Sequence, residues 1–268
     1  MNSAYKYTMI LAVMLASGCA LHPGVKEAIK TGDEVQVSLT CRLSNGDVVV
    51  TTDKSTAENA SVKKSRIFFP LKEYRPLPMK AGIIPEGDPV RWGFMDELNA
   101  CVARTAPGMR VGETKAIVCN PELVPGRAGQ ERFLRMARFR NRAKELRVPR
   151  AEYSARVGEE PVKGKPFKGD PDFPGRIIEV TDKEVVISFS LPESQKAQTP
   201  FGTGTVRDVG NHFEIALPVR EGDLARTGAH AGRISAVEEN MFTIDYGYSF
   251  AGEALRCSVE TMRHEVRK

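Results

Sequence analysis

Residues 32–50 read GDEVQVSLTCRLSNGDVVV. Apolar and polar residues alternate from Val35 to Leu39, which is the period-two pattern of a β-strand with one buried face. Asn45-Gly46 then marks a tight turn, because these two residues adopt the positive backbone angles that hairpin turns require. The valines at 48–50 supply a return strand. The stretch therefore predicts an antiparallel hairpin.

More regular structure is predicted between this hairpin and residue 119. Several prolines at 70–89 exclude a long helix there, because proline lacks the amide hydrogen that a helix uses. Apolar residues recur at helical spacing from about Phe94 to Ala103, so we expect one amphipathic helix that ends before Pro107-Gly108. Residues 115–119 predict another strand. This half of the chain should combine strands with one helix.

A basic segment from Gly126 to Arg150 separates the two halves of the chain. It carries nine arginine and lysine residues with a few apolar residues between them. A basic amphipathic helix on anionic lipid or on a partner has such a composition, and so does a solvated connector. Because such runs are more often solvated, we expect residues 127–147 to be a basic connector.

The second half contains an internal repeat. Residues 175–182 read GRIIEVTD, and residues 232–239 read GRISAVEE, an offset of 57. Each copy continues into a β-rich run, so each predicts a strand, a tight acidic turn and a return strand. Two copies are too few for a solenoid and predict a duplicated β-hairpin unit. Two unrelated hairpins with similar turns are the alternative.

The start of the chain has the features of a secretory signal. One positive charge precedes an apolar run at 7–16, which is too short to span a bilayer as a helix. Ala16-Ser17-Gly18-Cys19 then has the pattern of a bacterial lipoprotein cleavage site. We expect a signal peptide over 1–18, lipid on Cys19 and a tether over 19–30. An ordinary secretory signal is the alternative.

Composition indicates a folded body that acts without nucleic acid. Hydrophobic residues make up 41% of the chain and charged residues 27%. The net charge of +5 is modest, is compatible with nearby anionic lipid and does not demand a nucleic-acid partner. Ala20 follows the lipidated cysteine, where aspartate would favour the inner membrane. By resemblance to other bacterial lipoproteins, we expect the periplasmic face of the outer membrane.

Cysteine and histidine usage predicts no metal site and no cofactor. The chain has five cysteines and four histidines, with no CxxC motif. With Cys19 assigned to the lipid, four cysteines remain in an oxidising compartment. They are expected either to form disulfides or to be buried as free thiols. The histidines are scattered along the chain and are expected to face solvent.

Short motifs follow one another in a family-like order: GDEVQV at 32–37, RLSNG at 42–46, GF at 93–94, GMRVGE at 108–113, PE at 121–122, VPR at 148–150 and the stretch 245–255. Their order resembles FKBP-type peptidyl-prolyl cis-trans isomerases, especially the SlyD-like branch with an inserted chaperone domain. The resemblance implies an α+β, mostly β fold, in which an FKBP-like antiparallel sheet wraps on one helix. The FKBP-like domain would be discontinuous, over 31–126 and 251–262, and a β-rich insert would cover 148–250.

The resemblance also implies a peptide-binding pocket that needs no nucleophile or metal. In that family, an apolar pocket accelerates rotation about the X–Pro peptide bond, because it removes water from the prolyl ring and favours the twisted amide. The family's pocket positions are held here by Leu39, Val50, Val90, Arg91, Phe94, Val124 and Cys257. Phe94 keeps the aromatic floor, but most of the family's polar and aromatic residues are replaced. We therefore expect weak isomerase activity or none.

A disulfide is a further implication of the resemblance. Cys41 and Cys257 occupy adjacent strands in the family's sheet, and neither position is usually a cysteine there. We therefore hypothesise a Cys41–Cys257 bridge, which would close a very long loop and stabilise the domain.

The expected function is that of an envelope lipoprotein with a degenerate FKBP-type isomerase pocket that assists the folding of exported proteins. Its partners would be unfolded or proline-containing exported polypeptides, and the Cys19 lipid would hold it at the membrane. The alternative is a non-catalytic chaperone or assembly factor that uses the same fold as a binding module. A third hypothesis is a structural lipoprotein that docks through the basic residues 127–150.

Overall fold

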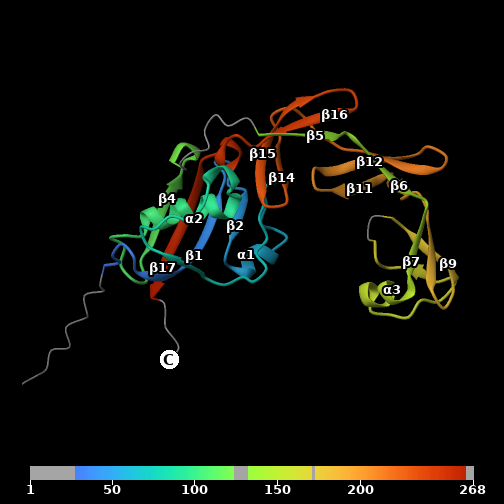
Figure 1. Ribbon diagram of the computed structural model, residues 1–268, viewed down its shortest axis with the longest axis horizontal. Helices are drawn as coiled ribbons and strands as arrows, with labels where there is room; N and C mark the ends of the chain where they lie inside the picture. Colours follow the sequence, from blue (N-terminus) through green and yellow to red (C-terminus); the bar gives the residue numbers. More distant parts are fainter. Residues whose placement is uncertain (1–27, 124–131, 171–172, 264–268) are drawn as a thin grey trace, which may run out of the picture.

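The computed structural model describes residues 28–123, 132–170 and 173–263. In these ranges the chain is mostly β, with four antiparallel sheets and three α-helices. Figure 1 shows two parts: a compact body, which carries the N-terminal half and the last strand, and an arm that extends away from it. The chain leaves the body after residue 123 and returns to it before residue 255.

One five-stranded sheet forms the framework of the body. Its strands are β2 (Val48–Thr51), β1 (Glu34–Arg42), β17 (Leu255–Arg263) and β4 (Thr114–Cys119) in that order, with β3 (Leu77–Lys80) paired to the first half of β1. The antiparallel pairing of β1 with β2 confirms the hairpin predicted from the alternating pattern. The last strand of the chain therefore lies between two strands from its first half.

The helix α2 (Phe94–Thr105) packs against this sheet and confirms the predicted amphipathic helix. Its N-terminus is stabilised because the Gly93 amide donates to the Asp96 carboxylate at 2.9 Å. The negative charge of Asp96 also interacts favourably with the positive end of the helix dipole. Leu98 and Val102 are buried in the main core. The shorter helix α1 (Lys54–Glu58) has no buried residue.

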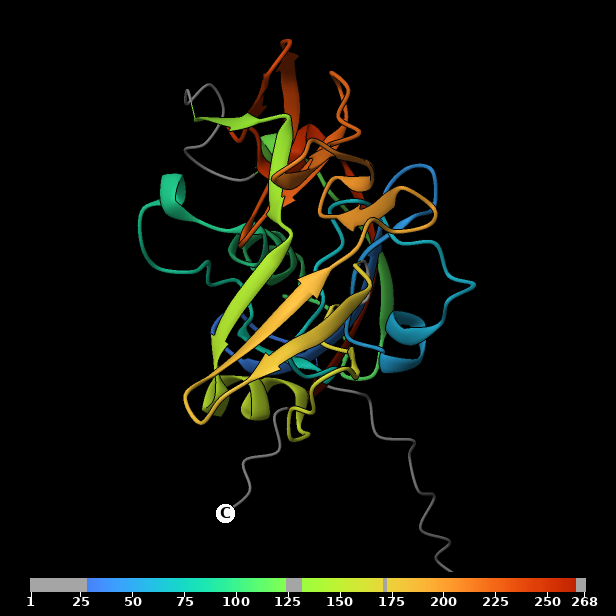
Figure 2. The same cartoon turned by 90° about the vertical axis from the view of Figure 1, so that its right-hand side faces the viewer.

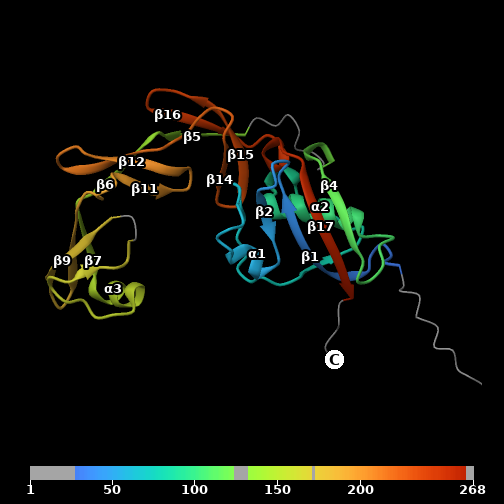
Figure 3. The same ribbon diagram turned by 180° about the vertical axis from the view of Figure 1, so that it is seen from behind.

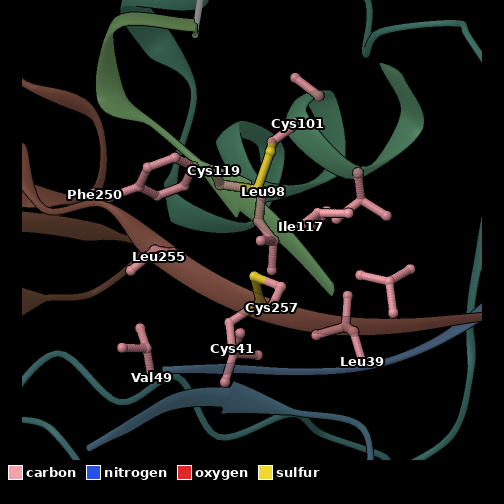
Figure 4. Packing of buried hydrophobic residues seen from close by; sticks show 14 of the residues in the cluster. Leu39, Cys41, Val49, Leu98, Cys101, Ile117, Cys119, Phe250, Leu255 and Cys257 are labelled. Atoms are coloured by element: carbon pink, nitrogen blue, oxygen red, sulfur yellow. A yellow bond between two sulfur atoms is a disulfide. The ribbon is translucent and has the colours of Figure 1, made fainter. Parts of the chain in front are cut away.

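Two disulfides cross-link the core of the body (Figure 4). The structure joins Cys41 on β1 to Cys257 on β17, which is the pair hypothesised from the sequence. A second bridge joins Cys101 on α2 to Cys119 on β4 and so attaches the helix to the edge of the sheet. Both bridges are buried among apolar side chains.

The arm is built on three consecutive short strands from the basic segment: β5 (Phe133–Ala137), β6 (Phe139–Ala143) and β7 (Glu145–Pro149). Each adds to a different sheet. The sheet next to the body runs β14 (Leu224–Thr227), β15 (His230–Val237), β16 (Met241–Asp245), β5. The middle sheet runs β11 (Lys196–Thr199), β12 (Gly202–Asp208), β13 (His212–Ala216), β6. The far sheet runs β7, β10 (Glu184–Phe189), β9 (Gly175–Val180), β8 (Pro166–Phe167).

The third helix, α3 (Arg150–Val157), packs against the far sheet. It follows β7 and packs its buried Tyr153 into the apolar cluster of that part of the arm. Figure 2 looks along the arm from this end and shows α3 beneath the strands. Gly158 ends the helix in the left-handed conformation, which glycine adopts without steric cost. Short 3₁₀ turns occur at Pro89–Arg91, Pro121–Leu123 and Ser249–Gly252.

Three equivalent units make up the arm, as two recurring hydrogen bonds show. Inside each unit an amide donates to a carbonyl of the preceding segment at 2.8 or 2.9 Å: Ile177 to Lys165, Val206 to Gln195 and Ile234 to Asp223. We call β5, β6 and β7 the outgoing strands. At the end of each unit an amide donates, at 2.7 to 2.9 Å, to the carbonyl just before one of them: Phe189 to Lys144, Leu217 to Arg138 and Tyr246 to Arg132. The acceptors of the second set are spaced six residues apart.

The predicted duplication is therefore part of a triplication. Both hairpins identified from the sequence are present, as β9–β10 and β15–β16, and each carries a bulge at the same relative position. The middle unit, β12–β13, lies between them and was not expected. The units run opposite to the outgoing strands, so that the first unit pairs with β7 and the last with β5.

The predicted fold class is wrong in its architecture, although its mostly β character is right. The described chain has four antiparallel sheets and three helices in place of one FKBP-like sheet wrapped on one helix with a single inserted domain. The physical reason is that each unit of the arm recruits its own strand from residues 133–149, so the insert divides into three sheets. The helical alternative for that segment is wrong over 133–149, because these residues form three strands.

Candidate functional site

Four of the residues implied as pocket residues converge inside the body. The exposed fractions of Leu39, Val50, Phe94 and Cys257 are 3, 0, 1 and 2%. Figure 4 shows Leu39 and Cys257 among the packed apolar side chains, with Cys257 joined to Cys41. Side chains buried to this degree contact their own chain, so these four contribute to the core and offer no surface to a peptide.

The other implied residues are placed differently. Val90 and Arg91 lie in the 3₁₀ turn that precedes α2, and Arg91 is exposed. Val124 lies outside the described residues, as does the expected lipidation site, Cys19. The structure therefore brings together four of the seven implied pocket residues and leaves Arg91 on the surface.

Aromatic side chains fill the space around Phe94. The Phe69 ring stacks on it with 4.3 Å between ring centroids and an interplanar angle of 8°, and Phe250 meets it edge-on at 5.6 Å. Both partners are buried in the same core. Because aromatic pairs of this kind bury much apolar area, the cluster stabilises the body. Phe69 was not identified from the sequence, since nothing local distinguishes it from a loop phenylalanine.

A hairpin tip from the arm covers the N-terminus of α2. The Phe94 amide donates to the Ala229 carbonyl at 2.8 Å. Gly93 lies so close to this tip that a Cβ there would stand 2.9 Å from the Ala229 oxygen. Ala231 is buried in the body's core, and the Arg226 guanidinium lies 5.0 Å from the centre of the Phe69 ring. The third unit of the arm thus closes the side of the body where the pocket was implied.

A buried carboxylate positions the return of the chain to the body. Glu97 of α2 accepts a hydrogen bond from the Phe250 amide at 3.0 Å. Phe250 and Ala251 have φ angles of 53° and 59°, a left-handed conformation that costs energy for residues with a Cβ. The Glu97 contact and the burial of Phe250 hold this turn, which directs the chain into β17.

The edge of the arm next to the body exposes apolar side chains. Phe133 and Leu134 on β5 are 58% and 39% exposed. β5 pairs only with β16 in its sheet, so its other edge has no strand beside it among the described residues. An unpaired strand edge with apolar side chains is a template for pairing with an extended chain. This is the candidate site for binding a polypeptide.

Charges along the basic segment are mostly paired. Five cations of the run have carboxylate partners, in the pairs Arg135–Glu238, Arg142–Asp170, Lys144–Asp208, Arg147–Glu184 and Arg150–Glu160. The side-chain hydrogen bond from Lys144 lowers the pKa of Asp208, and that from Arg150 lowers the pKa of Glu160. The segment is therefore a partly neutralised strand ladder, which weakens the case for docking to anionic lipid through it.

The described part of the chain contains neither a metal-binding cluster nor a membrane-spanning helix. Within residues 28–123, 132–170 and 173–263, no group of three or more histidine, cysteine, aspartate or glutamate side chains is arranged to hold a metal ion. Nor does any helix in those ranges have the length and apolar composition needed to cross a membrane.

Comparison with known proteins adds no relative on which to base a function. The sequence matches none of the models of known protein families and none of the curated proteins. The resemblance to FKBP-type isomerases therefore rests on the short motifs of the sequence alone and stays a prediction. No family assignment is made for the chain.

Proposed function

We propose that this chain is a non-catalytic polypeptide-binding protein that assists the folding of exported proteins in the bacterial envelope. The observation that carries the proposal is the open edge of β5 with its exposed Phe133 and Leu134. Extended polypeptides bind such edges through main-chain hydrogen bonds, and apolar side chains add affinity. Folded proteins usually protect edges of this kind with charges or covering segments, so an exposed apolar edge indicates a binding role.

Burial of the implied pocket favours the non-catalytic alternative. An isomerase of the resembled family needs a hollow that receives a prolyl ring, whereas Phe94 is enclosed by Phe69, Phe250 and the Ala229 tip. Opening that site would expose a packed aromatic core. Contacts of this kind are strong, because truncating one buried aromatic side chain to alanine costs about 3–5 kcal/mol. This cost supports binding without catalysis.

Suppression of aggregation tests the proposal. A chemically unfolded exported protein is diluted into buffer with the full chain, and light scattering is followed. The Phe133→Ser, Leu134→Ser double variant should lose most of the suppression, because it removes the apolar contacts of the open edge. The matched control is Val118→Ser, which changes an exposed valine on β4, an edge strand of the body. Equal loss in both variants, or in neither, contradicts the proposal.

Isomerase activity is the second candidate, and one observation favours it. The aromatic cluster of Phe69, Phe94 and Phe250 lies directly beneath a hairpin tip, so lifting the tip would open an apolar hollow. Gly93→Ala should lift it, because the added Cβ meets the Ala229 carbonyl. A proline-isomerisation assay on both forms decides. No acceleration in either form rejects catalysis, and acceleration in the variant alone identifies the hairpin as a lid.

A further inference from the structure

A cavity lies where the middle sheet of the arm meets the sheet next to the body. It has a volume of about 400 Å³ and is lined by residues of β5, β6, β11, β14 and the turns beside them. In Figures 1 and 3 the tip of the β11–β12 hairpin points toward β14 at this junction. Met136, Phe201 and Leu217 give the cavity apolar walls, and Phe201 and Leu217 are buried. We call it the junction cavity.

Two arginines and no carboxylate line the junction cavity. Arg140 of β6 is exposed, and its side chain has no hydrogen-bond or ion-pair partner among the described residues, whereas five other cations of the basic segment pair with carboxylates. Arg226 is held in place, because its guanidinium lies over the Phe69 ring and donates to the Gly228 carbonyl at 3.3 Å. The cavity thus has unbalanced positive charge beside apolar walls.

We propose that the junction cavity binds the C-terminal carboxylate of a polypeptide whose last residue is apolar. This inference rests on the proposed function and names the part of the client that is recognised. Guanidinium groups bind carboxylates through paired, charge-assisted hydrogen bonds. The volume falls within the range of about 300–1,000 Å³ that is usual for small-ligand sites.

A chain terminus fits this chemistry better than an internal acidic residue does. At a C-terminus, one α-carbon carries both an apolar side chain and a carboxylate, which matches apolar walls beside two arginines. An aspartate or glutamate side chain brings the carboxylate without the apolar group. The edge strand β11 ends at the cavity with Gln198 and Thr199, and it pairs only with β12 in its sheet. Residues that precede the terminus can extend along that edge.

Peptide binding to the full chain tests the inference. The probe is a short fluorescent peptide ending in leucine with a free carboxylate, followed by fluorescence anisotropy. The same peptide with a C-terminal amide should bind at least about tenfold more weakly, because it cannot form charge-assisted hydrogen bonds with the guanidinium groups. Arg140→Gln should weaken the free-acid peptide to a similar extent. The matched control is Arg256→Gln, an exposed arginine of β17 in the body, which should leave binding unchanged.

Each remaining outcome decides the inference. Equal binding of acid and amide overturns it, as does equal weakening by Arg140→Gln and Arg256→Gln. Binding of anionic phosphatidylglycerol vesicles that depends on Arg140, without peptide binding, also overturns it in favour of lipid. If no free-acid peptide binds while Phe133 and Leu134 still matter for aggregation, the inference fails and the proposed function stands. If the peptide binds but those two residues do not matter, the β5 edge fails and the cavity stands.

Discussion

Phe94 shows at the scale of one residue how burial decides a role. Its position after Gly93 resembles a motif of FKBP-type isomerases, and its aromatic character agrees with the implied pocket floor. In the structure its ring is stacked, capped and almost fully buried. A residue type can therefore be compatible with a binding site while its contacts make it part of the core.

Replacing Phe94 with alanine should destabilise the body by about 3–5 kcal/mol, because the change leaves a cavity in a packed aromatic cluster. Denaturant unfolding of the oxidised chain measures the free energy of unfolding. Phe133→Ala is the control, since its side chain is mostly exposed, and it should change the free energy by less than about 0.5 kcal/mol. A small effect at Phe94 would mean that its ring is not enclosed.

Asp53 offers a prediction on pH at the same scale. It caps α1, and hydrogen bonds from the Thr56 and Ser55 side chains, then from their amides, lower its pKa from 3.8 to about 2. Because the folded-state pKa is depressed, the stabilising contribution is present above pH 3.8 and is lost as the pH falls through about 2. An NMR titration of the Asp53 carboxyl should give that midpoint, and Thr56→Val should raise it. A midpoint near 3.8 in both forms contradicts the cap.

Among the elements, the three-unit arm shows how a structural repeat can be recognised only in part from the sequence. Equivalent residues Ile177, Val206 and Ile234 are 29 and 28 positions apart, which explains the offset of 57 seen in the sequence. The first and third units share a GRI motif, but the middle unit reads GTV at the same place. Strand pairing needs only an apolar residue facing inward there, so Val206 makes the same hydrogen bond as Ile177 and Ile234 without the GRI motif.

The basic segment carries a second periodic signal. Arg132, Arg138 and Lys144 stand six residues apart, and their carbonyls accept the last amide of each unit. Five-residue strands separated by one junction residue explain this spacing. These strands were not predicted, because a run of cationic residues is also typical of a solvated connector. Long cationic side chains are nevertheless tolerated on the solvent-facing side of a strand. The six-residue spacing of cations is the signal that could have identified the three outgoing strands.

Arg138→Pro tests the role of the junction residues. Proline removes the amide that donates to the Asn240 carbonyl and fixes the backbone between β5 and β6. Hydrogen exchange should show lost protection in the two sheets that these strands complete, with the body unaffected. Arg138→Ala keeps the backbone amide and should retain protection in both sheets. Unchanged exchange in the proline variant would contradict the continuous strand ladder.

At the scale of the whole molecule, the two disulfides are expected to contribute unequally to the free energy of unfolding. Cys41–Cys257 closes a loop with a sequence separation of 216, and Cys101–Cys119 one of 18. On the loop-entropy model, the longer loop contributes about 2 kcal/mol more to stability. Denaturant unfolding of the two double-serine variants measures the difference. Intact mass should also rise by two hydrogen atoms per bridge on reduction, and an unchanged mass would refute both bridges.

The first and last parts of the chain form the body, and the residues between them form the arm. β17 enters the middle of the body sheet only after the whole arm has been traversed, and Glu97 and the Phe250 turn direct this return. The Ala229 tip then packs back onto α2. Because these contacts join segments far apart in the chain, no local pattern could have shown where the return strand enters the body sheet.

By itself, the sequence determined the hairpin at 32–50, the helix from Phe94, and two of the three hairpins in the arm. Periodicity and turn residues specify such elements, because their hydrogen bonds join residues close together in the chain. Only the tertiary structure decided that the implied pocket is filled, that each outgoing strand joins a different sheet, and that two arginines line the junction cavity. Those features depend on which distant surfaces pack together, and packing has no local signature.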